Sequence, residues 1–249
     1  MLPSAERHPG AIPRAAVVPA VLALAALAWL IADERMAAMD EGLWTDPGSL
    51  GFYVPVWVAM TAAMMLPSAA PMVVAHSEVE RRRRDLGRAP KHGASAAFVG
   101  GYLLAWTAFG VVAYALFEWI GSLDLDALSW GRDGRYLAAA VIAVAAIYQL
   151  TPLKDLCLAK CRSPLAFVVG SWRDGRAGAV RMGVEQGAWC VGCCWALMAT
   201  LFALGLMSIG WMVAIAGVVA AEKLLPWERV ANRGVALLLV VLAAFVALG

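Results

Sequence analysis

Three of the five cysteines in this chain cluster in an apolar segment. They are Cys190, Cys193 and Cys194 in the sequence Trp189-Cys190-Val191-Gly192-Cys193-Cys194-Trp195. On an α-helix, which turns by about 100° per residue, the three thiols fall on one narrow face with Met198 close to it. Clustered thiolates are ligands for soft metals, with Cu(I) the best match and Zn(II) the second.

The other two cysteines, Cys157 and Cys161, lie upstream in a more polar segment. The dipeptide Thr151-Pro152 is typical of a helix N-cap followed by the first helical residue, and Pro164 is expected to end that helix. Because the two cysteines are four positions apart, they share one face of the predicted helix. Nearby basic residues favour thiolate over thiol; they are Lys154, Lys160 and Arg162.

A third group of soft side chains lies in an earlier apolar segment. Met64 and Met65 precede Pro67 and Pro71, and His76 follows. The prolines are expected to break the helical hydrogen-bond ladder, and in lipid such a break must be buried in protein or line a cavity. We therefore predict metal-binding thiols with a methionine and histidine group as acceptor or exit: Cys157, Cys161, Cys190, Cys193, Cys194, Met64, Met65 and His76.

The composition predicts the kind of fold that positions these groups. The chain has 249 residues, of which 62% are hydrophobic and only 15% are charged, whereas about a quarter of the residues in soluble domains are charged. We predict an all-α, polytopic membrane helix bundle, with a cytoplasmic tail at residues 1–13 and one membrane-embedded domain at residues 14–249. The first apolar segment is interpreted as a retained span, because no convincing cleavage site follows it.

Seven apolar segments are proposed as spans: Arg14–Ile31, Phe52–Ala75, Ala94–Ile120, Tyr136–Leu150, Ala188–Leu204, Ser208–Ala221 and Gly234–Leu248. A full span needs about 20 residues, so the fourth, sixth and seventh are short. The fifth and sixth are read as a tight hairpin, and one bent segment in their place would reduce the count to six. Glu222 and Lys223 are expected at the membrane interface, where they can pair or extend toward water.

The basic residues predict an orientation in the membrane. They concentrate in the N-terminal tail and in three connecting segments, residues 76–93, 151–187 and 222–233. The opposite side has only Arg35, Arg132 and Arg135. The positive-inside rule then predicts a cytoplasmic N-terminus and an exported C-terminus. All five cysteines, including those in a cytoplasmic loop at residues 151–187, would face a compartment that keeps thiols reduced.

Several of these motifs together resemble a bacterial family of predicted metal-binding integral membrane proteins. They are Met64-Met65-Leu66-Pro67-Ser68-Ala69, Tyr148-Gln149-Leu150-Thr151-Pro152-Leu153-Lys154 with Cys157 and Cys161, the Cys190–Cys194 motif with Met198, and Glu222-Lys223. The resemblance runs from about Val54 to Pro226. It implies a protein of the bacterial cytoplasmic (inner) membrane that binds copper and delivers it to copper-dependent oxidases. It does not assign individual metal ligands.

The leading hypothesis is therefore a Cu(I)-handling membrane chaperone rather than an enzyme. Its expected partners are membrane lipid and a copper-dependent oxidase or copper carrier. Nucleic acid is not expected, because topology and lipid headgroups account for the arginine run at residues 81–84. Two alternatives remain open. One is a membrane thiol–disulfide oxidoreductase using Cys190 and Cys193, and the other is a small transporter or structural subunit whose cysteines only pack.

Overall fold

The computed structural model describes residues 14–36, 48–87, 93–122, 132–204, 208–225 and 228–248. Every regular element in these ranges is an α-helix, which confirms the all-α prediction. In chain order the helices are α1 (Arg14–Met36), α2 (Leu50–Asp85), α3 (Ala94–Gly121), α4 (Arg132–Tyr148), α5 (Pro152–Cys161), α6 (Pro164–Gly170), α7 (Gly175–Leu204), α8 (Ile209–Leu224) and α9 (Glu228–Leu248). The predicted tail at residues 1–13 lies outside the described residues.

Each of the seven predicted apolar segments contains a helix, but the count of seven spans is not confirmed. Five helices are long and apolar enough to cross a membrane: α1, α2, α3, α7 and α9. A sixth crossing is possible if α4 and α5, which are bent by 70° at a short break, form one broken span. α8 has 16 residues, which is below the usual minimum of about 17 for a span. The helices are compatible with a membrane protein.

Two helices continue well beyond the apolar segments that predicted them. α2 extends to Asp85 because Glu78 pairs with Arg81 at 2.8 Å and Glu80 pairs with Arg84 at 3.1 Å, and such pairs one turn apart stabilise helices. α7 begins at Gly175, so Cys190 lies about 22 Å inside the helix rather than at the mouth of a span. The predicted loop of residues 151–187 is largely helical, since it contains α5, α6 and the first part of α7.

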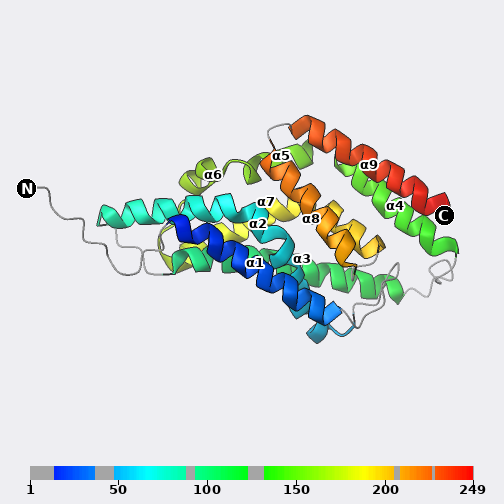
Figure 1. Cartoon of the computed structure of the whole chain (residues 1–249), viewed down its shortest axis with the longest axis horizontal. Helices are drawn as coiled ribbons and strands as arrows, with labels where there is room; N and C mark the ends of the chain where they lie inside the picture. The colour runs from blue at the N-terminus through cyan, green and yellow to red at the C-terminus, as the bar shows by residue number, and fades with distance from the viewer. Residues whose placement is uncertain are drawn as a thin grey trace, which may run out of the picture.

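The prolines of α2 do not interrupt it. The helix continues through Pro67 and Pro71 as a single element, as the predicted apolar segment Phe52–Ala75 implied, although each proline lacks the backbone N–H of a complete hydrogen-bond ladder. Figure 1 shows that α2 bends along its length, and proline is the usual cause of such a bend because it removes one backbone donor and crowds the preceding turn. The methionines before Pro67 are buried in the core.

α7 lies at the centre of the bundle, where it contacts α3, α4, α5 and α8 (Figure 1). Its contact with α3 is very close because glycines face the neighbouring backbone. A Cβ atom at Gly183 would lie 2.0 Å from the carbonyl oxygen of Phe98, and one at Gly101 would lie 2.2 Å from the carbonyl oxygen of Val180. The sequence Gly100-Gly101 therefore contains one position that requires glycine, because a Cβ at Gly100 meets nothing within 4 Å.

These adjacent glycines give a matched test of the α3–α7 contact. Gly101→Ala is expected to separate the two helices and lower the free energy of unfolding by about 1–3 kcal/mol, the usual cost of overpacking. Gly100→Ala is expected to be neutral or stabilising by up to about 1 kcal/mol, because alanine favours helix more than glycine does. Unfolding in detergent measures both changes. Equal effects of the two substitutions would contradict the close contact.

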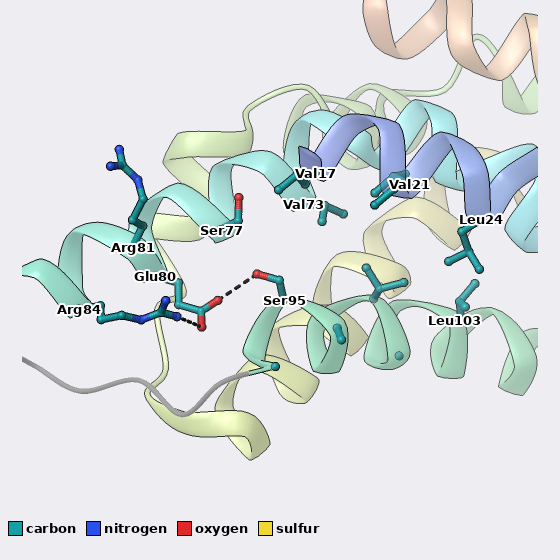
Figure 2. A pocket seen from close by; sticks show the side chains of 15 residues that line it. Val17, Val21, Leu24, Val73, Ser77, Glu80, Arg81, Arg84, Ser95 and Leu103 are labelled. Carbon is teal, nitrogen blue, oxygen red and sulfur yellow. Dashed lines mark hydrogen bonds and ion pairs between the residues drawn. The ribbon is translucent and has the colours of Figure 1, made fainter. Parts of the chain in front are cut away.

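A cavity of about 460 Å³ lies between α1, α2 and α3. Figure 2 shows its apolar walls and, at one end, Glu80, which accepts hydrogen bonds from Arg84 at 3.1 Å and from Ser95 at 2.9 Å. No cysteine, methionine or histidine is among the described residues that line it. The soft ligands of this protein therefore gather elsewhere.

Candidate metal centre

The end of α4 and the start of α5 bring the second cysteine group to α7. The Thr151 hydroxyl accepts a hydrogen bond from the backbone nitrogen of Lys154 at 3.3 Å, and Pro152 is the first residue of α5, which confirms the predicted N-cap. Tyr148 donates its hydroxyl hydrogen to the carbonyl oxygen of Gly192 at 2.5 Å. α5 ends at Cys161, and two residues separate it from the next helix, which begins at Pro164. Its last residue consequently lies beside the cysteines of α7.

Three thiols from the two helices converge. The sulfur atoms of Cys161, Cys190 and Cys193 all lie within 4.8 Å of one another, with 3.8 Å between those of Cys161 and Cys193. Three sulfurs that bind one metal at about 2.3 Å are separated by roughly 4 Å. The three thiols, called the cysteine triad below, are therefore spaced to hold one soft metal ion after only small side-chain movements.

The remaining two predicted cysteines lie outside the cysteine triad. Cys194 is buried with its sulfur 3.2 Å from that of Cys193, but it does not approach all three sulfurs. Cys157 is also buried and faces Gly192, where a Cβ atom would lie 2.8 Å from its sulfur. Both Cys157 and Cys161 were predicted to bind the metal. The structure brings only Cys161 into the group of three sulfurs within 4.8 Å.

The predicted methionines and the predicted histidine lie on α2, on either side of Ser68 along the helix. Met64 and Met65 are buried one helical turn from Ser68, a residue that connects α2 to the thiols through Lys223. His76 lies about 12 Å further along α2 than Ser68. Its ring is stacked between those of Phe98 and Trp172, with centroids at 4.8 and 5.3 Å. Among the described residues it belongs to no metal-compatible group of three ligands.

Lys223 contacts the cysteine triad directly, which the sequence-based assignment to a membrane interface missed. Its side chain is buried, and Nζ donates hydrogen bonds to the sulfur of Cys190 at 3.0 Å and to the hydroxyl of Ser68 at 3.1 Å. The hydroxyl of Tyr102 also lies 3.0 Å from the Cys190 sulfur. In the described part of the chain no carboxylate forms an ion pair with Nζ, which leaves the Cys190 sulfur as the group that, as a thiolate, would supply the counter-charge of a buried ammonium.

Glu222, the residue before Lys223, holds α8 against the bend between α4 and α5. It pairs with Lys154 at 2.6 Å, both side chains are almost fully buried, and Gln149 donates a further hydrogen bond at 2.9 Å. Arg162 adds hydrogen bonds to the carbonyl oxygens of Glu222, at 2.8 Å, and of Leu225. Glu222 does form a pair, as the sequence allowed, but its partner is Lys154 in the protein interior rather than a group at an exposed surface. A glutamate followed by a lysine at the end of an apolar segment was the only sequence signal for this network.

Comparison with known proteins identifies the chain at the level of a family. No curated protein and no solved structure matched it. The PpoB2 family, described as copper chaperones, matches residues 54–246. That range contains every predicted ligand, the cysteine triad and the buried partners of Glu222 and Lys223. The chain belongs to the PpoB2 copper chaperone family.

Proposed function

We propose that this protein binds one Cu(I) ion at Cys161, Cys190 and Cys193 and passes it to a copper-dependent oxidase or to a carrier that supplies one. The convergence of three sulfurs from two helices carries the proposal. Soft thiolates suit Cu(I), which is stable with two or three such ligands. The family match supports copper as the metal, and the apolar helices support a place in the bacterial inner membrane.

The unequal burial of the three sulfurs suggests a route for the metal. Cys190 and Cys193 are buried, whereas Cys161 at the end of α5 is partly exposed. A copper-loaded carrier thiolate can therefore exchange with Cys161 first, and the ion then passes to the two inner sulfurs, Cys190 and Cys193, as the carrier thiolate leaves. Copper stays as Cu(I) throughout, so no electron donor or acceptor is needed. Met64 and Met65 lie beyond Ser68 and Lys223 and are the candidate exit group.

The basic residues support a cytoplasmic N-terminus and an exported C-terminus for the membrane-bound protein. The arginines at the end of α2 form a charged extension of that helix, where Arg83 pairs with Asp174 at 2.8 Å and Arg84 pairs with Glu80. In this orientation the partly exposed Cys161 receives copper from the cytoplasmic side. Delivery outward would then proceed along α2 toward its N-terminal half.

The metal site can be tested on the purified, full-length protein in detergent. After anaerobic loading with Cu(I), we expect one copper ion per chain and X-ray absorption that shows three sulfur neighbours at about 2.3 Å. A variant with all five cysteines replaced by serine should bind no copper at this site. Unchanged copper content in that variant would refute the thiolate site.

The sulfur atoms of Cys190 and Cys193 lie within 4.8 Å of each other, which also favours the alternative function of a thiol–disulfide oxidoreductase. Rapid alkylation of thiols in growing cells separates the two functions. An oxidoreductase should show Cys190 and Cys193 as a disulfide in part of the population. A copper chaperone should instead show reduced thiols that resist alkylation only when copper is present.

A further inference from the structure

We propose that Lys223 makes the cysteine triad selective for a monovalent metal ion over a divalent one. The inference rests on the proposed Cu(I) function and adds to it the residue that discriminates between Cu(I) and Zn(II). Thiolates alone discriminate poorly, because both ions bind cysteine sulfur. A fixed positive charge beside the site repels a divalent ion more strongly than a monovalent one.

Lys223 lies close to one of the metal-compatible sulfurs, and no carboxylate of the described residues neutralises its charge. Nζ lies 3.0 Å from the sulfur of Cys190, which is one of the three metal-compatible ligands. The adjacent acidic residue cannot neutralise Lys223, because the Glu222 carboxylate is already occupied by Lys154 at 2.6 Å. The other described hydrogen-bonding groups here are the uncharged hydroxyls of Ser68, bound to Nζ, and of Tyr102, bound to the same sulfur; Cys193 and Cys194 also lie close enough to interact with the ammonium.

Burial makes the charge effective. Lys223 and Cys190 are both buried, so water and salt screen their interaction much less than at a surface. A metal bound to Cys190 at about 2.3 Å would lie within roughly 5 Å of Nζ. At that distance and at the effective dielectric typical of proteins, one additional unit of positive charge on the ion changes its affinity by roughly 100-fold.

Coordination number works in the same direction. Structural Zn(II) sites are almost always four-coordinate, whereas the cysteine triad offers three sulfurs. The Cys190 sulfur is covered by the Lys223 ammonium and the Tyr102 hydroxyl, and the nearest further thiol is Cys194, whose sulfur lies 3.2 Å from that of Cys193. An ammonium has no lone pair and cannot serve as a ligand. Lys223 therefore closes the position on its own side of Cys190, and a fourth ligand for Zn(II) would have to come from Cys194.

The test compares the affinities of Cu(I) and Zn(II) in the full-length protein and in variants, each by competition with a chelator of known affinity. In Lys223→Met and Lys223→Gln the preference for Cu(I) should fall by roughly 100-fold, mainly through tighter Zn(II) binding. Lys223→Arg keeps the charge and should keep the preference. Lys160→Met is the matched control, because Lys160 is an exposed lysine next to Cys161 and water screens its charge.

The outcomes separate this inference from the proposed function. An unchanged preference in a neutral variant that remains folded, judged by size-exclusion chromatography and circular dichroism, would overturn the role of Lys223. A loss of preference in Lys223→Arg equal to that in Lys223→Met would assign the effect to packing and overturn it as well. Two neutral variants are used so that one folding failure does not decide the result. Absence of Cu(I) binding in the unmodified protein would instead refute the metal site itself.

Discussion

Cys190→Ser is expected to weaken Cu(I) binding by more than about 100-fold, while Cys157→Ser leaves it nearly unchanged. Cys190 supplies a sulfur to the cysteine triad and also holds Lys223 and Tyr102 at 3.0 Å each. Loss of one ligand leaves two sulfurs for the ion and leaves the buried ammonium without its counter-charge. Changes to groups that only support metal ligands already cost 10–100-fold, so the loss of a ligand should exceed that range.

Competition with a Cu(I) chelator under anaerobic conditions measures these affinities. Cys157 is a suitable control because it is a buried cysteine on the same two-helix contact but outside the cysteine triad. Cys161→Ser should also weaken binding, and it should slow the uptake of copper from an external thiolate carrier. If Cys157→Ser and Cys190→Ser weakened binding equally, the metal would have to lie elsewhere among the five thiols.

Glu222→Gln is expected to destabilise the protein by about 3–5 kcal/mol, the usual effect of removing one partner from a buried ion pair. The substitution leaves Lys154 buried beside an amide rather than a carboxylate, and Lys154 has no exposed surface in the folded chain. The carboxylate also accepts a hydrogen bond from Gln149, so α4, α5 and α8 all lose a shared contact.

Chemical unfolding in detergent, followed by circular dichroism, measures this loss. Asp155→Asn makes the same carboxylate-to-amide change in α5, but Asp155 is exposed and accepts one hydrogen bond from Asn232 at 3.0 Å. It should cost no more than about 1 kcal/mol. The double variant Lys154→Met, Glu222→Leu should recover part of the stability, because an apolar pair of similar size leaves no charge unpaired. Equal losses in Glu222→Gln and Asp155→Asn would contradict the buried pair.

The sequence predicted the helices better than it predicted their ends. Hydropathy located all seven apolar segments, because lipid-compatible helices are the simplest way to satisfy the backbone in an apolar chain. It misplaced the start of α7, since residues 175–187 are too polar to count as a span yet are held in helix by close packing on α3 through Gly183. Hydropathy records the apolar surroundings of a segment and does not record contacts between helices.

The composition of the candidate site was only partly predictable. Helical phase correctly grouped Cys190 and Cys193, but it gave no reason to prefer Cys161 over Cys194 as their neighbour. That choice depends on how α5 crosses α7, which is fixed by Tyr148 and Glu222 through contacts between residues distant in sequence. His76 was a reasonable candidate by residue type, but its ring is stacked with those of Phe98 and Trp172 and joins no metal-compatible group of three ligands among the described residues.

Glu222 and Lys223 are successive residues of one helix, and their side chains hold two different parts of the molecule. Glu222 binds Lys154 at the bend between α4 and α5, and Lys223 binds the sulfur of Cys190 in the cysteine triad. A short helix cannot shift at one of these residues and stay fixed at the next. A displacement of Lys223 on metal binding would therefore be transmitted through Glu222 to the bend between α4 and α5, so that the site and the packing of three helices are mechanically connected.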